Sequence, residues 1–264
     1  MTWITHAPSA QDSPAVLRSL VPERLRRFRQ AAPGGRHFDV MRLYVLDGQI
    51  VEHCQALFRA VEVLLRETIH RALSARFGAR WFASPAVQGT LDPRVLAALG
   101  KAVVDVAQLR HAPTPGDVVA EVMLGTWVKL LGPGIGNRHE TGLWVPALAA
   151  CFQKGAAHQS GRPRSDVHLL AQRLLWARNR VNHCEPVVFG FPLPGQLTAA
   201  RQRRRLTPHQ LLDDVRALAG CMDAAVGAWV GSWSDADALL ADPLLGDALA
   251  FMDRQPRIVM EGRR

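Results

Sequence analysis

The sequence contains few aromatic residues and almost no tyrosine. Aromatic residues make up 6% of the 264 positions, and a single Tyr accompanies seven Trp. We therefore do not expect phenolic chemistry to be central to the function. Strand signals are also sparse, and helical periodicity dominates instead.

The cysteines are few and lie far apart. No two of them form a CxxC pair, and none combines with histidines at the spacing of a zinc finger. This pattern argues against a structural zinc site and against a disulfide framework, and it suits a reducing compartment. The four residues are Cys54, Cys151, Cys184 and Cys221.

Long hydrophobic runs are missing as well. No stretch approaches the ~20 consecutive apolar residues of a membrane-spanning helix. The first residues, "MTWITHAPSAQDSPAV", have no basic segment followed by an apolar core, which is the pattern of a signal peptide. We expect a soluble cytoplasmic protein without a membrane segment.

Positive charge exceeds negative charge. The formal net charge is +9 and the sequence pI is about 10.5. Such an excess favours an anionic partner, which could be nucleic acid, a nucleotide or an acidic protein. Arginine is used heavily and lysine is scarce. A compositional bias toward arginine explains the charge equally well, so the charge alone supports nucleic acid only weakly.

The longest helical pattern runs from Asp47 to Gly78 without a proline. Its apolar residues recur at steps of three and four, as in an amphipathic helix. They are Ile50, Cys54, Leu57, Phe58, Val61, Leu65 and Ile69. A shorter basic helix is predicted in "AVLRSLVPERLRRFRQA", ending at the proline and glycines of residues 33–35.

Further helices are predicted along the chain. One starts near Pro93, with the proline in its first turn, and another covers residues 113–131. The segment "WVPALAACFQ" predicts a shorter helix between two glycine-containing loops. Ser165 is predicted to cap a helix that Pro186 closes.

The last predicted helix starts with a cap at Thr207, a proline at 208 and Gln210 in the third helical position. It continues to residue 230, and a polar connection rich in glycine, proline and arginine precedes it. Together these patterns predict an all-α fold, a bundle of roughly six to eight helices with accessory N- and C-terminal helices.

The polar hexapeptide "RNRVNH" follows an apolar helical stretch. Arg178 and His183 lie about 140° apart around a straight helix, so they do not share a face. Asn179 lies on the side of His183, and Asn182 lies on the side of Arg178. A single helix could not bring the arginine and the histidine onto one small ligand, but a two-fold related copy could.

These residue types suit cleavage of a phosphodiester bond in RNA. A neutral histidine can take the proton of a ribose 2′-hydroxyl near pH 7. Arginine donors match phosphate oxygens, and an amide such as Asn179 can orient the imidazole. No metal is required when the substrate supplies the nucleophile. The alternative is structural: a histidine near a helix C-terminus interacts favourably with the helix dipole, and Arg and Asn are common on solvated faces.

The segment "ARNRVNHCEPVV" resembles the Arg-Asn-x-x-x-His signature of HEPN domains, in particular the Abi-like branch linked to bacterial abortive infection. Two upstream segments, "ALFRAVEVLLRETIHRALSARFGARWF" and "DVVAEVMLGTWVKLL", are similar to other helices of that branch. The three segments occur in the expected order and cover residues 41–190.

The resemblance implies a HEPN-like helical domain over residues 41–230, with extensions at 1–40 and 231–264. It implies a homodimer in which two Arg-x4-His segments face a shared cleft. It also implies metal-independent endoribonuclease activity, without a cofactor, in phage defence or a toxin–antitoxin setting. An antitoxin or another regulatory partner then becomes an expected partner. Arg178 and His183 take the catalytic positions, with Asn179 beside them.

The sequence departs from the family pattern at several positions. Arg66-Glu67 stands where the branch often has Arg-Asn, and Asn182 occupies a position that is often small. Glu185 stands where a related toxin group has a tyrosine, so regulation by modification of that residue is not expected. Family members can lose activity and persist as binding modules. A non-catalytic nucleic-acid or nucleotide-binding module, or a dimeric helical scaffold, is therefore the alternative function.

Several charged residues are candidates for supporting roles. Glu62 and Arg66 could pair along their helix, or Glu62 could position Arg178. Glu185 could act as an acid, hold an arginine of a second copy, or only shape the turn before Pro186. The segment "ARQRRR" could contact phosphates or form a solvated loop. Its arginines are Arg201, Arg203, Arg204 and Arg205.

Overall fold

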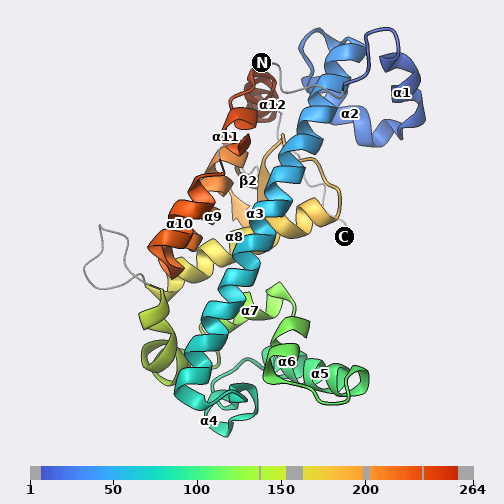
Figure 1. Ribbon diagram of the computed structural model, residues 1–264. Helices are drawn as coiled ribbons and strands as arrows, with labels where there is room; N and C mark the ends of the chain where they lie inside the picture. Colours follow the sequence, from blue (N-terminus) through green and yellow to red (C-terminus); the bar gives the residue numbers. More distant parts are fainter. Residues whose placement is uncertain (1–6, 137, 153–162, 199–202, 234, 255–264) are drawn as a thin grey trace, which may run out of the picture. The chain divides into compact units, whose positions relative to one another are not determined.

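The computed structural model describes residues 7–136, 138–152, 163–198, 203–233 and 235–254. This part of the chain is helical apart from one two-stranded sheet, which confirms the predicted all-α class (Figure 1). Within it, no helix is both long and apolar enough to span a bilayer.

The chain forms two compact units that alternate along the sequence. Unit 1 contains residues 1–56, 176–213 and 233–264, and unit 2 contains residues 57–175 and 214–232. The described residues near both ends of the chain therefore belong to the same unit as the hexapeptide.

Two helices occupy the N-terminal region where one was predicted. They are α1 (Ser13–Ser19) and α2 (Pro22–Ala31). The prediction of a single helix is wrong because Leu20 and Val21 are extended ahead of Pro22, which starts α2. A short turn, η1 (Pro33–Gly35), ends the region at the predicted break.

The helix predicted from Asp47 is longer than expected. α3 (His37–Phe77) has 41 residues and ends before Gly78, whose φ of 87° confirms the predicted stop. Its N-terminal half lies in unit 1 and its C-terminal half in unit 2. Ile50 is buried in the first half, and Val61 and Leu65 in the second, as the periodicity predicts, whereas Cys54 is only half-buried.

The next elements belong to unit 2. They are η2 (Trp81–Ala83), α4 (Pro85–Gln88), α5 (Pro93–Leu109), α6 (Pro115–Glu121), α7 (Leu124–Leu130), η3 (Glu140–Leu148) and η4 (Ala149–Cys151). The start of α5 at Pro93 confirms the prediction, and the side chain of Asp92 caps it.

The single helix predicted over residues 113–131 is wrong, because the chain is extended at Met123 between α6 and α7. The break frees the carbonyl of Val122, which accepts a hydrogen bond from the buried indole of Trp127 at 3.1 Å. Satisfying this buried donor offsets the lost helical hydrogen bonds.

α8 (Arg164–Asn182) carries the hexapeptide at its C-terminal end. The predicted cap at Ser165 is wrong, because α8 begins one residue earlier. The carbonyl of Pro163 accepts hydrogen bonds from the backbone N–H groups of Asp166 and Val167. Ser165 therefore lies inside the first turn.

A β-hairpin occupies the connection after α8. β1 (Phe191–Leu197) pairs antiparallel with β2 (Arg203–Leu206), with Phe191 opposite Leu206 and Pro192 opposite Arg205. The sequence did not predict these strands, since proline is common in loops. Both strands are edges of a two-stranded sheet, where proline is tolerated.

α9 (Pro208–Met222) begins as predicted. The side chains of Thr207 and Gln210 each bind the other's backbone N–H, at 3.1 and 3.0 Å. The predicted continuation to residue 230 is wrong, because Asp223 is extended and caps a separate helix, α10 (Ala224–Gly231). The chain ends with α11 (Asp235–Leu240) and α12 (Pro243–Arg254).

Each unit has its own aromatic centre. In unit 1, the ring of Phe28 meets those of Tyr44 and Phe189 edge to face, and α12 packs against α2. In unit 2, Trp81 and Trp127 are fully buried with ring centroids 6.0 Å apart. Both tryptophans thus serve as core residues.

Candidate functional site

The hexapeptide forms the last turn of α8 and the residue that follows it. Ala177 and Val181 are buried and anchor this turn in unit 1. Arg178 is half-buried, whereas Asn179 and His183 are exposed. The imidazole that was predicted to act on a substrate is therefore open to solvent.

A Schellman motif ends α8. The backbone N–H of Glu185 donates to the carbonyl of Arg180 at 3.0 Å, and that of Cys184 donates to Val181 at 2.9 Å. Cys184 has a φ of 52° and stands where this motif usually has glycine. His183 is the last residue before it. The helix thus ends at its own capping motif, before the predicted stop at Pro186.

Arg180 was not among the residues singled out from the sequence, yet it organises this end of the helix. Its Nε donates to the carbonyl of Pro186 at 2.9 Å, and its guanidinium forms an ion pair with Glu185. Burial lowers the pKa of Arg180, and the charge of Glu185 opposes that shift. Glu185 thus has an arginine partner within its own chain.

Two more arginines bind the backbone of residues 184–190, which we call the α8 loop. Arg24 on α2 donates from Nη2 to the carbonyl of Cys184 at 2.6 Å. Arg205 on β2 donates from Nε to Phe189 and from Nη2 to Gly190, each at 2.6 Å. Three arginines from three separate elements therefore hold this loop.

A half-buried aspartate on α3 holds the α8 loop. Oδ1 of Asp47 accepts hydrogen bonds from the backbone N–H groups of Val187 at 2.6 Å and Val188 at 3.0 Å. Burial raises the pKa of Asp47 to about 6, although these two hydrogen bonds and the charges of Arg180 and Arg24 act in the opposite direction. The loop is therefore fixed on both sides by charged side chains.

The arginines predicted to bind RNA differ in their surroundings. Arg203 and Arg204 are exposed on β2, whereas Arg205 is half-buried and bound to the α8 loop. The pKa of Arg205 is lowered to about 10. Burial is the largest cause, and the charges of Arg180, Arg27 and Arg203 act in the same direction. The prediction for Arg201 lies outside the described residues.

Glu62 and Arg66 lie in unit 2, on the second half of α3. Nε of Arg66 lies 3.5 Å from the carboxylate of Glu67 and is buried without a hydrogen bond to any residue that the structure describes. Glu62 is half-buried and has interactions of its own. Arg178 belongs to unit 1, so its predicted pairing with Glu62 stays a prediction.

No group of three or more potential metal ligands occurs among the described residues. His139 is almost fully buried. Burial lowers the pKa of His139 to about 4, so the ring is neutral near pH 7. His139 therefore belongs to the core of unit 2.

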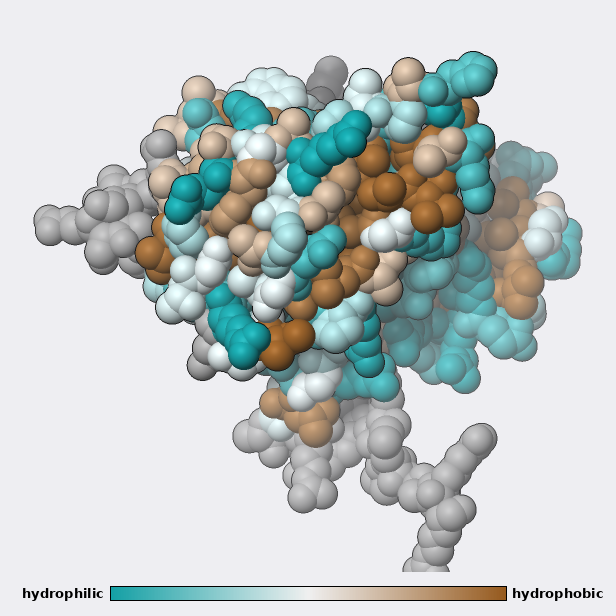
Figure 2. Space-filling view, turned by 90° about the horizontal axis from the view of Figure 1, so that it is seen from below, coloured by the Kyte–Doolittle hydropathy of each residue, from teal (hydrophilic) through white to brown (hydrophobic). Residues whose placement is uncertain are grey.

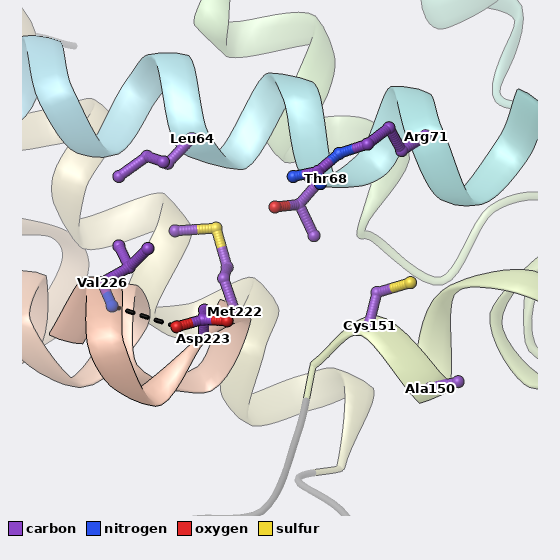
Figure 3. A pocket seen from close by; sticks show the side chains of 8 residues that line it. All are labelled: Leu64, Thr68, Arg71, Ala150, Cys151, Met222, Asp223 and Val226. Atoms are coloured by element: carbon purple, nitrogen blue, oxygen red, sulfur yellow. Dashed lines mark hydrogen bonds between the residues drawn. The ribbon is translucent and has the colours of Figure 1, made fainter.

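Unit 2 also contains a cavity of about 460 Å³. Figure 3 shows Thr68 and Arg71 on α3 across from Met222 and Asp223, with Cys151 to one side. The carboxylate of Asp223 caps α10. The cavity combines a cation, a hydroxyl and a thiol with an apolar lining, and no predicted site residue lines it.

An apolar groove of about 560 Å³ lies between α5, α6 and the segment around α4. Figure 2 views the molecule from the side of these helices, and hydrophobic residues gather there in patches between hydrophilic ones. Leu99, Val103 and Val118 contribute to the lining. The groove is thus separate from the residues around His183.

Comparisons with models of protein families, with curated proteins and with solved structures found no match to this chain.

Proposed function

We propose that the protein is a metal-independent endoribonuclease that cleaves single-stranded RNA, with His183, Arg178 and Asn179 as its site. The observation that carries this proposal is the exposure of His183 at the capped end of α8, beside a loop held by arginines. A polyanionic substrate fits such a positively charged surface.

The reaction needs three tasks that these residue types can perform. His183 takes the proton from a ribose 2′-hydroxyl, and the 2′-oxygen attacks the adjacent phosphorus. The bond to the 5′-oxygen of the next nucleotide breaks, and that oxygen takes up a proton. Arg178 stabilises the charge on the phosphoryl oxygens, and Asn179 orients the imidazole. The products carry a 2′,3′-cyclic phosphate and a 5′-hydroxyl.

A second copy of the chain completes the proposed site. Positions 178 and 183 lie about 140° apart around α8, which separates their side chains within one helix. In a two-fold dimer, the arginine of one copy can meet the histidine of the other. The biological setting we propose is phage defence or a toxin–antitoxin pair in the cytoplasm, where an antitoxin or another regulatory partner would restrain the enzyme.

The test compares the wild type with His183→Ala on a labelled single-stranded RNA. We expect cleavage by the wild type, loss of cleavage in His183→Ala, and no inhibition by a chelator. His209→Ala is the matched control, because His209 is also an exposed histidine of unit 1. RNA that lacks the 2′-hydroxyl at the cut position should resist. Inhibition by the chelator, or equal cleavage of DNA, contradicts the mechanism.

A non-catalytic RNA-binding module is the second candidate. The number of arginines around the α8 loop favours it, because phosphate binding needs only positive charge and donors. The same two proteins distinguish the candidates when binding is measured beside cleavage. Binding by both proteins with cleavage by neither supports the module.

A further inference from the structure

Five arginines of unit 1 lie on the three elements whose side chains bind the α8 loop. Arg24 and Arg27 come from α2, Arg180 from α8, and Arg203 and Arg205 from β2. Hydrogen bonds to the loop backbone fix three of them: Arg24, Arg180 and Arg205. These three therefore have a structural role that needs no ligand.

The other two, Arg27 and Arg203, differ from these three. Both side chains are exposed, and neither forms a hydrogen bond or an ion pair within the described part of the chain. Their charges nevertheless reach the loop arginines. Burial is the largest cause that lowers the pKa of Arg180 and of Arg205. The charge of Arg27 lowers both pKa values further, and the charge of Arg203 also lowers that of Arg205. Arg27 and Arg203 are thus held among like charges.

Few carboxylates balance this group. Glu185 pairs with Arg180, and Asp47 is occupied by the amides of the loop. Glu23 lies one turn before Arg27 on α2, but no ion pair joins them. Clustered like charges are unfavourable in the protein alone, and a ligand with several negative charges would relieve the repulsion.

We propose that Arg27 and Arg203 bind backbone phosphates of the RNA strand that reaches His183. The identity of the ligand rests on the proposed function. His183 is adjacent to Cys184, whose carbonyl is bound by Arg24, and Arg24 and Arg27 lie three residues apart on the same side of α2. An RNA strand whose phosphates bind Arg27 and Arg203 can therefore extend to the imidazole of His183.

A phosphate backbone fits this surface better than an acidic protein. Arginine donors match two phosphate oxygens at once, and the interfaces of nucleic-acid-binding proteins are polar and positively charged. The neighbour of Arg27 that is apolar, Phe28, is buried in unit 1. The side of α2 that carries Arg24 and Arg27 therefore presents charge, while the apolar side chains Leu25 and Phe28 lie in the core of unit 1.

α2 supplies its own matched controls. Arg26 and Arg29 are exposed arginines of the same helix. At about 100° per residue, Arg29 lies on the opposite side of α2 from Arg24 and Arg27, whereas Arg26 lies opposite Arg24 and about a quarter turn from Arg27. Neither is among the main causes of the pKa shifts of Arg180 and Arg205. Replacing them removes the same charge from the same helix without touching the proposed surface.

The experiment measures binding of a fluorescent oligouridine of about 20 nucleotides with 2′-O-methyl riboses, which cannot be cleaved by 2′-hydroxyl attack. Fluorescence anisotropy is recorded with the full chain between about 50 and 200 mM KCl. We expect Arg27→Ala and Arg203→Ala each to weaken binding several-fold. Each should also lower the slope of log K against log salt by about 0.7, the value for one phosphate contact on a single strand.

The controls and the charge-conserving variant sharpen the result. Arg26→Ala and Arg29→Ala should leave the slope unchanged, and Arg27→Lys should keep it because the charge remains. Equal slopes for Arg27→Ala, Arg203→Ala and wild type would overturn the inference. A second result would also overturn it. If the protein does not bind the oligouridine but binds polyaspartate, and that binding depends on Arg27, the ligand is an acidic polypeptide and not RNA.

Failure of the proposed function gives a different outcome. If unmodified RNA stays intact while the 2′-O-methyl strand binds with the expected arginine dependence, the enzyme is rejected and the phosphate surface stands. If RNA is cleaved but binding does not depend on Arg27 or Arg203, the surface is rejected and the enzyme stands.

Discussion

Arg180 and Glu185 are joined twice, once through the backbone and once through their side chains. The N–H of Glu185 donates to the carbonyl of Arg180 at 3.0 Å, and the Arg180 guanidinium pairs with the Glu185 carboxylate. The Arg180 side chain is 11% exposed, against 51% for Glu185. The arginine is thus the desolvated member of the pair, and it fixes the turn that presents His183.

Arg180→Ala should lower the free energy of unfolding by about 1–3 kcal/mol, since it leaves the carbonyl of Pro186 without its side-chain donor. Glu185→Gln should cost less than about 1 kcal/mol, because its carboxylate is half in solvent. Urea denaturation of both variants measures the difference. Equal losses would mean that Arg180 acts only through the ion pair.

Cys184→Gly should stabilise the protein. The left-handed conformation of Cys184 costs a non-glycine residue about 1–2 kcal/mol. Glycine removes that cost but loses about 0.5–1 kcal/mol of unfolded-state entropy, so the net gain should be about 0.5–1 kcal/mol. Cys184→Ala is the control, because it removes the thiol and keeps the strain. A loss of stability in Cys184→Gly would show that the thiol makes a compensating contribution.

The carboxyl of Asp47 should make stability depend on pH. Its pKa is raised from the ordinary value of 3.8 to about 6 in the folded protein. The folded state therefore binds more protons than the unfolded state between these values, and stability falls as the pH rises from about 4 to 6. A tenfold change in the acid dissociation constant corresponds to about 1.4 kcal/mol. The cost of the charge is fully present only well above pH 6, where the carboxyl is ionised in both states.

Asp47→Asn provides the comparison, because an amide oxygen can still accept from Val187 and Val188 but does not titrate. Chemical denaturation at several pH values should show the wild type losing stability relative to Asp47→Asn as the pH rises from 4 to 6. Parallel curves for the two proteins would mean that the carboxyl is solvated in the folded state.

Thr207→Ala should cost about 1 kcal/mol, because it removes the reciprocal cap shared with Gln210. Ser165→Ala is the matched control. Both residues resemble N-caps in the sequence, but Ser165 lies inside the first turn of α8. Its replacement should change the free energy of unfolding by less than about 0.5 kcal/mol. Thermal denaturation of the two variants shows whether Thr207 stabilises its helix as an N-cap and Ser165 does not.

The same pair shows how far the sequence can predict this fold. Thr207 and Gln210 bind residues three positions away, so their cap could be predicted from local order. The break between α6 and α7 could not be predicted, because it depends on an indole that needs a particular carbonyl. Helix periodicity located the buried face of α3 but not its start, since no proline or glycine lies between the actual start at His37 and residue 47.

The arginines around the α8 loop show the limit for the candidate site. Arg24 binds the carbonyl of Cys184, 160 residues away, and no local pattern indicates such a contact. The segment "RRR" predicts positive charge but not which arginine faces the loop. The hairpin decides this, because Arg205 pairs with Pro192 near the buried end and Arg203 remains exposed. The motif predicts where the candidate site lies, and tertiary packing determines which residues surround it.

Mixing two inactive variants should test whether two copies of the chain share the site. Arg178→Ala keeps the histidine, and His183→Ala keeps the arginine. If each site takes its arginine from one copy and its histidine from the other, a mixed dimer has one complete site. Random exchange of subunits then restores about a quarter of wild-type cleavage, since half of the dimers are mixed and each has one of two sites. Cleavage should be measured on single-stranded RNA after mixing in equal amounts, and each variant alone is the control. No recovery, with exchange verified by a mass label, would mean that Arg178 and His183 of the same chain must act together, and the shared site would have to be abandoned.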